Sequence, residues 1–509
     1  MADTTDRPPL STDVFDPERW GLPLAAVQDL GQRLHECWER FHDCFTTKTR
    51  DTSSWAAVYL RGLLLLPADR NYANVARRVV GLHDDGQKLQ QFMSDSPWPA
   101  QRVFAQIQEE ITQQAALHGG VLSLDESADA RAGHQSAGAA RQHNGRLGKV
   151  DLCQVGVALS YSCKDFWAMV DAELYLPKDW FDKDHSKLRR QLHVPAARTF
   201  LTKGEIGLEL VRRARARGLP FTVVAGDAVY GRDGAFRAAL DDDGITYIVD
   251  VPEDYQVYLR PPVVGVPAAA PGQRGRAPSV PRVLSAEAAV EVRSLATGEL
   301  PWETIQVRGC ERGHVRMTCW RRRVWVVEGA RVREEWLLLH READGDIRYS
   351  LSNGSPDTTL ATLAGWRAGR YFVERTFQDS KSELGWDELV ARKYRAWMHH
   401  SALDALALWF IASVRLHWSG EHPRDQRLAQ ELEVEQLPAL SVANVRELLV
   451  AVIPLPRLTP EEAIQLVIQH LCHRARSTRS RLKKQAAGAT PSANEGGSAR
   501  APCTTAARD

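Results

Sequence analysis

The feature that most constrains the fold of this chain is a series of short apolar runs between residues 121 and 251. The runs occupy residues 121–124, 154–160, 166–176, 221–225 and 245–251, with helical periodicity at 202–217 and 234–240. Apolar runs of this length are typical of buried strands, and helices between the later runs indicate strand–helix–strand units. The order predicts an α/β core built on a mixed five-stranded sheet.

Helical periodicity dominates the regions around this core. Residues 24–118 carry apolar side chains at three- and four-residue steps, which predicts a set of amphipathic helices. The same pattern returns at 358–364, 370–383 and 396–414. A stretch rich in Pro, Ala, Gly and Arg precedes a β-like region at 302–349. We expect small helices over 422–470, then a basic run and a low-complexity tail.

Composition excludes several classes of protein. The 509 residues carry 65 basic and 64 acidic side chains, so bulk charge neither supports nor excludes a polyanionic partner. Eight cysteines without a Cys-x-x-Cys pair do not form the disulfide framework of a small secreted domain. We expect no signal peptide, because the first residues are polar and acidic. The longest apolar run, at 405–414, has about half of the ~20 residues that a bilayer crossing needs. We therefore expect a cytoplasmic protein without a membrane span.

Three acidic residues stand where carboxylates can converge. Asp125 follows the first apolar run and Asp227 the fourth, and side chains at strand ends of an α/β sheet face a crevice. Glu374 shares one face of a predicted helix with Arg370 and Lys381. Converging carboxylates can bind two Mg²⁺ ions for phosphodiester chemistry, and the cations can hold phosphate oxygens. A Glu–Arg pair of this kind more commonly forms a solvated salt bridge on a helix surface. A single Asp at a strand end likewise more commonly has a structural role.

Longer motifs show a family resemblance. They are LDESADARAGHQSAGAARQHNGRLGKVDLCQVGV (124–157), ELYLPKDW (173–180), VVAGDAVYG (223–231), YSLSN (349–353) and RYFVERTFQDSKSELG (370–385). From about residue 59 to residue 416, the chain resembles the DDE transposases of bacterial insertion sequences, which have a ribonuclease H-like core. It is most similar to the insertion-sequence-four superfamily, in the branch named for insertion sequence seven-hundred-and-one.

The resemblance implies a catalytic site with bound metal. Asp125, Asp227 and Glu374 correspond to the catalytic, metal-binding triad, with Mg²⁺ as the cofactor and Mn²⁺ as its substitute. Arg370 and Lys381 correspond to the basic residues that flank the Glu and contact DNA phosphates. The chain also departs from the pattern, since Arg367 stands in place of a Tyr and Glu126 in place of a second Asp.

Other residues are candidates for DNA contact. Arg141, Arg146 and Lys149 lie among glycines, a composition that suits close approach to a phosphate backbone and equally suits a solvated hairpin. Tyr230, three residues after Asp227, is a further candidate. The resemblance implies that a Trp of the β-rich insertion stacks on an extruded base. We rank Trp325 first among Trp302, Trp320, Trp325 and Trp336, because it lies close to three consecutive arginines, although core packing is the commoner role.

These observations divide the chain into seven segments. They are a disordered N-terminus (1–17), a helical and possibly DNA-binding region (18–118), the first part of the ribonuclease H-like core (119–255), a linker and β-rich insertion domain (256–347), the second part of the core (348–418), C-terminal helices (419–472), and a basic, then disordered tail (473–509).

The predicted function is that of a DNA transposase that cuts and joins the ends of an insertion sequence in the bacterial cytoplasm. Its partner is double-stranded DNA, and the joining of two ends implies at least a homodimer on DNA. A ribonuclease H-fold nuclease that cuts without joining is one alternative. An inactive DNA-binding protein derived from a transposase is the other.

Overall fold

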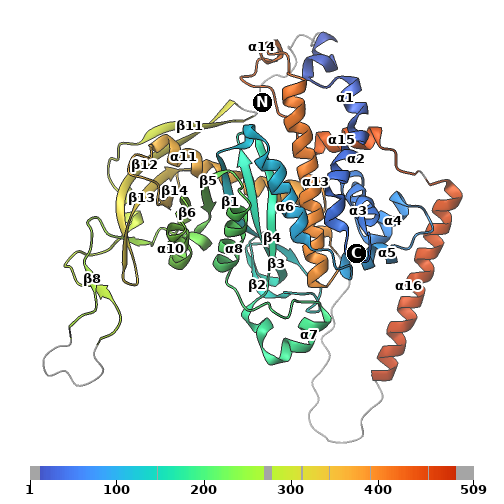
Figure 1. Cartoon of the computed structure of the whole chain (residues 1–509), viewed down its shortest axis with the longest axis horizontal. Coiled ribbons are helices and arrows are strands. Elements are labelled where there is room, and N and C mark those ends of the chain that lie inside the picture. Colours follow the sequence, from blue (N-terminus) through green and yellow to red (C-terminus); the bar gives the residue numbers. More distant parts are fainter. Residues whose placement is uncertain are drawn as a thin grey trace, which may run out of the picture. The chain divides into compact units, whose positions relative to one another are not determined.

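The structure is a computed structural model in which the chain forms two units, residues 1–455 and residues 456–509 (Figure 1). It describes residues 12–145, 147–268, 278–310, 313–342, 344–389, 391–456 and 458–488. No helix within these ranges combines the length and the apolar character that a membrane crossing demands.

The N-terminal region is helical, as predicted. Its helices are α1 (Leu24–Gln28), α2 (Leu30–Phe41), α3 (Ser53–Leu65), α4 (Tyr72–Val79), α5 (Gln87–Ser94) and α6 (Ala100–Thr112). Helices α3, α5 and α6 pack against α13 (Tyr394–Glu421), which is buried along most of its length. The apolar faces of these helices and one face of the sheet share a single hydrophobic core.

The expected disorder of the first 17 residues is wrong for the part that the structure describes. Short 3₁₀ helices occupy Thr12–Phe15 and Pro17–Trp20. The indole of Trp20 donates to the carbonyl oxygen of Val14 at 2.7 Å, and Arg19 forms an ion pair with Glu431 at 2.6 Å. Long-range contacts order this segment, and local composition did not indicate them.

The predicted mixed sheet is present. Five of its strands are β1 (Gly120–Ala130), β3 (Lys149–Cys163), β4 (Phe166–Tyr175), β5 (Phe221–Gly226) and β6 (Tyr247–Val251). Their spatial order is β4-β3-β1-β5-β6. Strands β1, β5 and β6 run parallel, and β3 runs antiparallel to β1 and β4. The first and fourth predicted strands are therefore neighbours, and the α/β class is confirmed.

Strand β1 is longer than its apolar run. Its pairing with β5 ends at Leu124–Gly226, but its pairing with β3 continues to Ala130–Cys153. Asp125 therefore follows the last parallel pair and does not end the strand, which corrects the sequence-based prediction. The polar residues after it alternate in burial, so no continuous apolar run marks this half of the strand. The short strand β2 (Ala140–Asn144) was also not predicted.

The β-rich insertion continues the core sheet. Its long strands are β11 (Glu303–Cys310), β12 (Gly313–Glu328) and β13 (Arg331–Arg341), and β14 (Ile347–Ser352) joins them to β6. The result is one ten-stranded sheet in the described part of the chain, where a separate β-domain was expected. Pairing with β14 covers the edge of β6, which would otherwise expose unpaired backbone groups.

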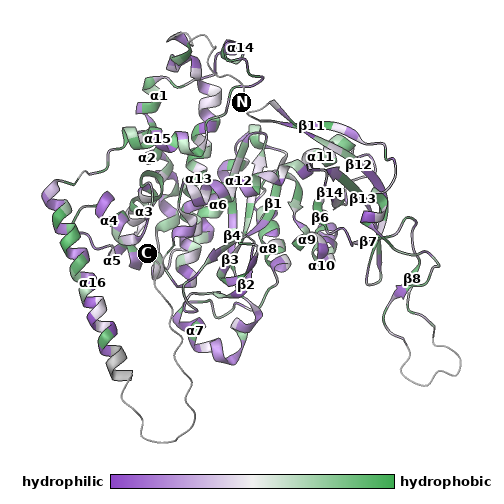
Figure 2. Ribbon diagram, turned by 180° about the vertical axis from the view of Figure 1, so that it is seen from behind, coloured by the Kyte–Doolittle hydropathy of each residue, from purple (hydrophilic) through white to green (hydrophobic). Residues whose placement is uncertain are grey.

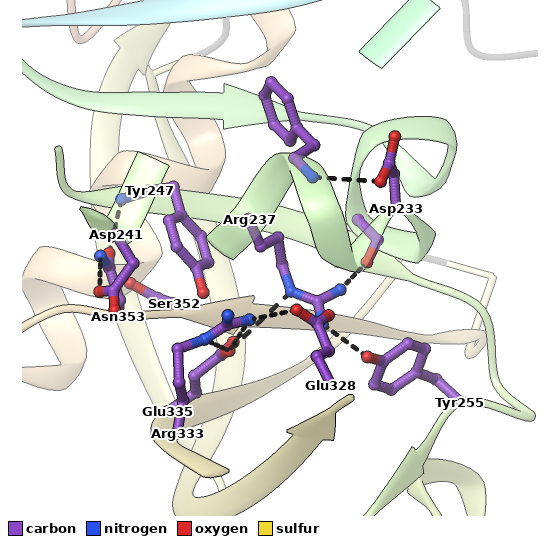
Figure 3. Close-up of polar contacts among 12 residues, drawn as sticks. Asp233, Arg237, Asp241, Tyr247, Tyr255, Glu328, Arg333, Glu335, Ser352 and Asn353 are labelled. Atoms are coloured by element: carbon purple, nitrogen blue, oxygen red, sulfur yellow. Dashed lines mark hydrogen bonds and ion pairs between the residues drawn. The ribbon is translucent and has the colours of Figure 1, made fainter. Parts of the chain in front are cut away.

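A buried ionic network joins the insertion to the core (Figure 3). Arg237 of α10 (Gly234–Asp242) donates to Glu328 and to the Tyr255 hydroxyl, both at 2.6 Å. Arg333 forms ion pairs with Glu328 at 3.0 Å and with Glu335 at 3.3 Å. The side chains of Arg237 and Glu335 are fully buried, and buried charges persist only when they are paired.

The second unit contains the 29-residue helix α16 (Pro460–Gly488). It includes the basic run and residues 485–488, which we expected to begin a disordered tail. Ala, Arg, Lys and Gln are strong helix formers, and these residues dominate its last turns. Its exposed large apolar side chains include Ile464, Val467, Ile468 and Leu471 of the first half, where the ribbon carries most of its hydrophobic colour (Figure 2). Residues 489–509 lie outside the described residues.

Candidate active site

Two of the predicted acidic residues lie side by side at the end of the parallel strands. Leu124 and Gly226 form the last paired position of β1 and β5, and Asp125 and Asp227 follow them directly. The Asp125 carboxylate accepts the backbone N–H of Glu126 at 2.7 Å. Asp227 caps the short helix α9 (Ala228–Arg232) and accepts a backbone N–H at 2.9 Å. The two aspartates are thus neighbours in the sheet, and their joint binding of a metal stays a prediction.

The negative charges of the two carboxylates repel each other. The side chain of Asp125 is only 16% exposed. Burial, followed by the charge of Asp227, raises the pKa of Asp125 to about 7. Burial, followed by the charge of Glu126, also raises the pKa of Asp227. Two buried carboxylates that repel each other in this way are suited to binding a cation.

The third predicted acid, Glu374, forms its ion pair with Arg370 and lies apart from the other two acids. Glu374 lies in α12 (Tyr371–Ser382), with its side chain 55% exposed and 3.1 Å from Arg370. The same guanidinium lies 3.9 Å from Asp125. Burial lowers the pKa of Arg370, but the surrounding carboxylates outweigh burial and raise it above its ordinary value. Within the described ranges, no three His, Cys, Asp or Glu side chains are close enough together to hold a metal ion.

Helix α12 lies along β1, with its predicted face toward the sheet. Arg370 contacts Asp125 near one end, and Lys381 forms an ion pair with Asp129 at 3.1 Å near the other. Asp125 and Asp129 are four residues apart in a strand, so both point to the face that α12 covers. The predicted stripe of Arg370, Glu374 and Lys381 is therefore present.

A third aspartate of the strand ends was missed by the sequence analysis. Gly226 of β5 pairs with Val249 of β6, so Asp250 occupies the same row as Asp125 and Asp227 on the next parallel strand. The signal was present, because each of the three parallel runs reaches an Asp at this level. In β6 a Val follows the Asp, so the acid lay inside an apolar run and was not considered.

Asp250 has three partners. Its carboxylate accepts from the Ser350 hydroxyl at 2.7 Å and lies 3.0 Å from Arg367 and 3.5 Å from Arg370. Arg367 is the residue that departs from the pattern of the resembled branch. Its guanidinium turns to Asp250 and thus belongs to the site.

The predicted DNA-contact residues have different surroundings. Arg141 and Lys149 are exposed on β2 and β3, and neither forms an ion pair with any described residue. Arg146, between them, lies outside the described residues. Tyr230 is fully buried beside Phe236, with ring centres 5.5 Å apart, so the prediction that it contacts DNA does not fit this structure. Its apolar ring fills the space beneath α9.

The tryptophans of the insertion differ in exposure. Trp325 is half-buried, and its backbone exchanges two hydrogen bonds of 2.8 Å with Tyr258. Trp336 is buried between Arg321 and Arg323, whose guanidinium carbons lie 4.3 and 4.9 Å from its ring centre. Core packing therefore accounts for Trp336, whereas the predicted base stacking by Trp325 stays a prediction.

Comparison with known proteins identifies the family. The model of the DDE superfamily endonucleases matches residues 40–314, which is more than half of the chain. The chain belongs to this family. The matched residues of this DDE superfamily member include Asp125 and Asp227 and end before Glu374.

A curated relative is also similar. The probable transposase for insertion sequence element IS701 of Microchaete diplosiphon is 28% identical over 186 residues, which are 36% of this chain and 45% of the relative. The match thus covers less than half of that relative. A solved structure of the piggyBac transposase synaptic complex with hairpin DNA shares 10% identity at a TM-score of 0.36, covering 89% of this chain and 83% of the other. That likeness is too slight to bear on the site.

Proposed function

We propose that this protein is a DNA transposase that cuts and joins the ends of an insertion sequence. The observation that carries the proposal is the pair Asp125 and Asp227, side by side where the parallel pairing of β1 and β5 ends, beneath a helix with Glu374. Membership of a DDE endonuclease family and similarity to a probable transposase support the same class of reaction. On this proposal, the sheet and α12 form a ribonuclease H-like catalytic core.

The acidic residues suit a divalent cation in their chemistry. Magnesium prefers carboxylate oxygens, and Asp125 and Asp227 are two such groups on neighbouring strands, where burial and mutual repulsion raise the pKa of Asp125 to about 7. Asp125 and Asp227 would hold the ion, and Glu374 would complete the set after leaving Arg370. When bound, Mg²⁺ or Mn²⁺ would activate an attacking water or 3′-hydroxyl and stabilise the leaving oxygen.

The basic residues of α12 would bind the DNA backbone. Arg370 and Lys381 lie on the face of α12 beside the carboxylates, where a scissile phosphate must lie. Each is now paired with an acid of β1, and a phosphate can replace that acid as the partner of the cation. Arg370 can approach a phosphate with two parallel N–H groups, which fixes its orientation as well as its position.

The nucleic-acid partner and the assembly follow from the reaction. Double-stranded DNA at the element ends and at the target would be the substrate, and Arg141 and Lys149 offer exposed charge for its backbone. Two ends must be held together for joining, so we propose a homodimer on paired ends. The place of action would be bacterial DNA in the cytoplasm.

The decisive experiment uses the DNA that flanks the gene. Labelled duplexes with these flanks are incubated with the protein and Mn²⁺ or Mg²⁺, and the products are separated on denaturing gels. The proposal predicts a free 3′-hydroxyl at one fixed position and then joined products. Cutting without joining would identify a nuclease. Binding without cutting in either metal would identify an inactive DNA-binding derivative.

A further inference from the structure

We propose that Asp250 is a positioning residue, which holds Arg367 and Arg370 against the catalytic carboxylates and is not itself a metal ligand. The proposal rests on the proposed function, because it assigns a role within that site. Asp250 stands in the same row as Asp125 and Asp227, so position alone would make it a third ligand. Its partners argue for the other role.

The negative charge of Asp250 is already balanced by neighbouring cations. One accepts from the Ser350 hydroxyl at 2.7 Å and lies 3.0 Å from Arg367 Nε, and the other lies 3.5 Å from Arg370 Nε. The carboxylate is 17% exposed, and both guanidinium groups are similarly buried. Arg367 has no second ion-pair partner among the described residues. Loss of Asp250 would therefore leave a buried cation uncompensated, which is costly.

The other two aspartates of the row are different. The Asp125 carboxylate accepts one backbone N–H, and its guanidinium neighbour is distant at 3.9 Å. Asp227 accepts one backbone N–H at the start of α9. Among the described residues, neither has a guanidinium group closer than 3.9 Å, whereas the negative charge of Asp250 is balanced by two guanidinium groups at 3.0 and 3.5 Å.

The positions of the Asp250 partners along the chain show which parts of the structure Asp250 connects. Asp250 precedes the β-rich insertion in the sequence, and Ser350, Arg367 and Arg370 all follow it. Ser350 lies directly opposite Asp250 on β14. Arg370 then contacts Asp125 and Glu374 at 3.9 and 3.1 Å. Asp250 thus connects the helices that follow the insertion to the strands that precede it, and sets the cation between the catalytic acids.

The backbone of Asp250 also supports the Asp227 loop. A Cβ atom on Gly231, near the end of α9, would stand 1.8 Å from the Asp250 carbonyl oxygen. The helix capped by Asp227 therefore packs directly on β6 at this residue. The same residue orders the arginines through its side chain and the Asp227 helix through its backbone.

The test combines D250A and D250N with R370A, and uses S350A as a control that removes one hydrogen bond to Asp250 without changing any charge. Cleavage rates, Mn²⁺ binding by calorimetry without DNA, and unfolding free energies are measured. We expect D250A to slow cleavage about tenfold or more, because a misplaced cation no longer meets the phosphate. Mn²⁺ affinity should stay within about twofold, and D250A should add less than about twofold in the R370A background.

Two outcomes would overturn the proposal. Loss of Mn²⁺ affinity in D250N comparable to that in D125N would make Asp250 a ligand. Independent, multiplying effects of D250A and R370A would show that Asp250 does not act through Arg370. D250N preserves shape and serves if D250A does not fold. If the wild-type protein cuts no DNA, the proposed function fails, but Mn²⁺ binding and the stability coupling of D250A with R370A still decide the role of Asp250.

Discussion

The acids on the parallel strands and the acid on helix α12 differ in burial and in the charges around them. Asp125 is 16% exposed and repelled by Asp227, whereas Glu374 is 55% exposed and paired with Arg370. The strands fix two carboxylates in place through backbone pairing, at an electrostatic cost. The helix supplies cations and one carboxylate with freedom to change partners. The strands thus preorganise one part of the site, and helix α12 provides a part that can change its contacts. Each prediction below tests this difference.

The largest effect is expected at the strand ends. D125N and D227N should each reduce DNA cleavage about 10³-fold or more, because a fixed ligand cannot be replaced by a neighbour. Cleavage of a labelled element end in Mn²⁺ measures this. DNA binding by fluorescence anisotropy is the control and should change little. Residual cleavage within about tenfold of wild type would remove these residues from the chemistry.

Glu374 should separate activity from stability. E374Q should lower cleavage about 10²-fold or more, while its unfolding free energy should change by less than about 0.5 kcal/mol, because the side chain is largely exposed. Rates in Mn²⁺ and thermal or urea unfolding measure the two effects. D29N is a matched control for the change of charge, because Asp29 is 48% exposed and pairs with Arg33, four residues on, at 3.1 Å. Equal losses of cleavage in both variants would contradict the role of Glu374.

The sequence predicted those elements of the fold that depend on local pattern. The apolar runs located all five core strands, and the spacing of Arg370, Glu374 and Lys381 placed one helix face correctly. Asp125 and Asp227 were found because each directly follows a predicted strand. Glu374 was singled out by its helix face with Arg370 and Lys381, and the family resemblance assigned it to the same site as residues about 150 and 250 positions away.

What could not be predicted depends on pairing over long distances. The joining of β14 to β6, which unites the insertion with the core, is invisible in the composition of either strand. The partners of Asp250 lie about 100 residues or more away in sequence, so its role emerged only from their contacts. Tyr230 seemed available because it follows Asp227, but its ring packs inward beneath α9.

The close packing of α11 against β1 can be tested through its effect on stability, and this effect should be smaller. Gly369 ends α11 (Leu360–Gly369), and a Cβ there would lie 2.7 Å from a methyl group of Val121 on β1. G369A should lower the unfolding free energy by about 1–3 kcal/mol and shift α12 away from Asp125. In G365A, the Cβ meets nothing within 4 Å, so this helix position is the control and should be neutral or slightly stabilised. Equal stability of both variants would contradict tight packing at Gly369.

A buried acid outside the site, Asp404, separates the effect of burial on a pKa from the effect of a neighbouring negative charge. Asp404 of α13 is fully buried, and burial raises its pKa to about 8, against the weaker opposing effects of Ser380 and Arg70. The folded protein keeps this proton after the unfolded chain has lost it, so its contribution to stability falls between about pH 4 and pH 8. D404N should flatten the fall in unfolding free energy over this range.

The Asp404 variant also sharpens the comparison with the strand ends. Mn²⁺ should stabilise wild type and D404N equally, because burial dominates at Asp404 and the charge of Asp387 is the weakest influence on it, whereas at Asp125 the charge of Asp227 is second only to burial. Urea unfolding at several pH values, with and without Mn²⁺, measures both effects. A response to Mn²⁺ that disappears in D404N would show that the ion acts at α13 and would contradict the proposed site.

The smallest effect is expected far from the acids, at the hairpin of β2 and β3. Arg141 and Lys149 are exposed and form no ion pair with described residues, so each is free to neutralise one phosphate. R141A and K149A should weaken DNA binding a few-fold each and reduce the slope of log Kd against log salt by about one. R348A, on an exposed arginine of β14 that pairs with Asp346, is the control. Because neither hairpin residue touches the carboxylates, the cleavage rate at saturating DNA should not change. A lower rate there with unchanged affinity would mean that the hairpin takes part in the chemistry, and the division between a fixed and an adjustable half would have to include it.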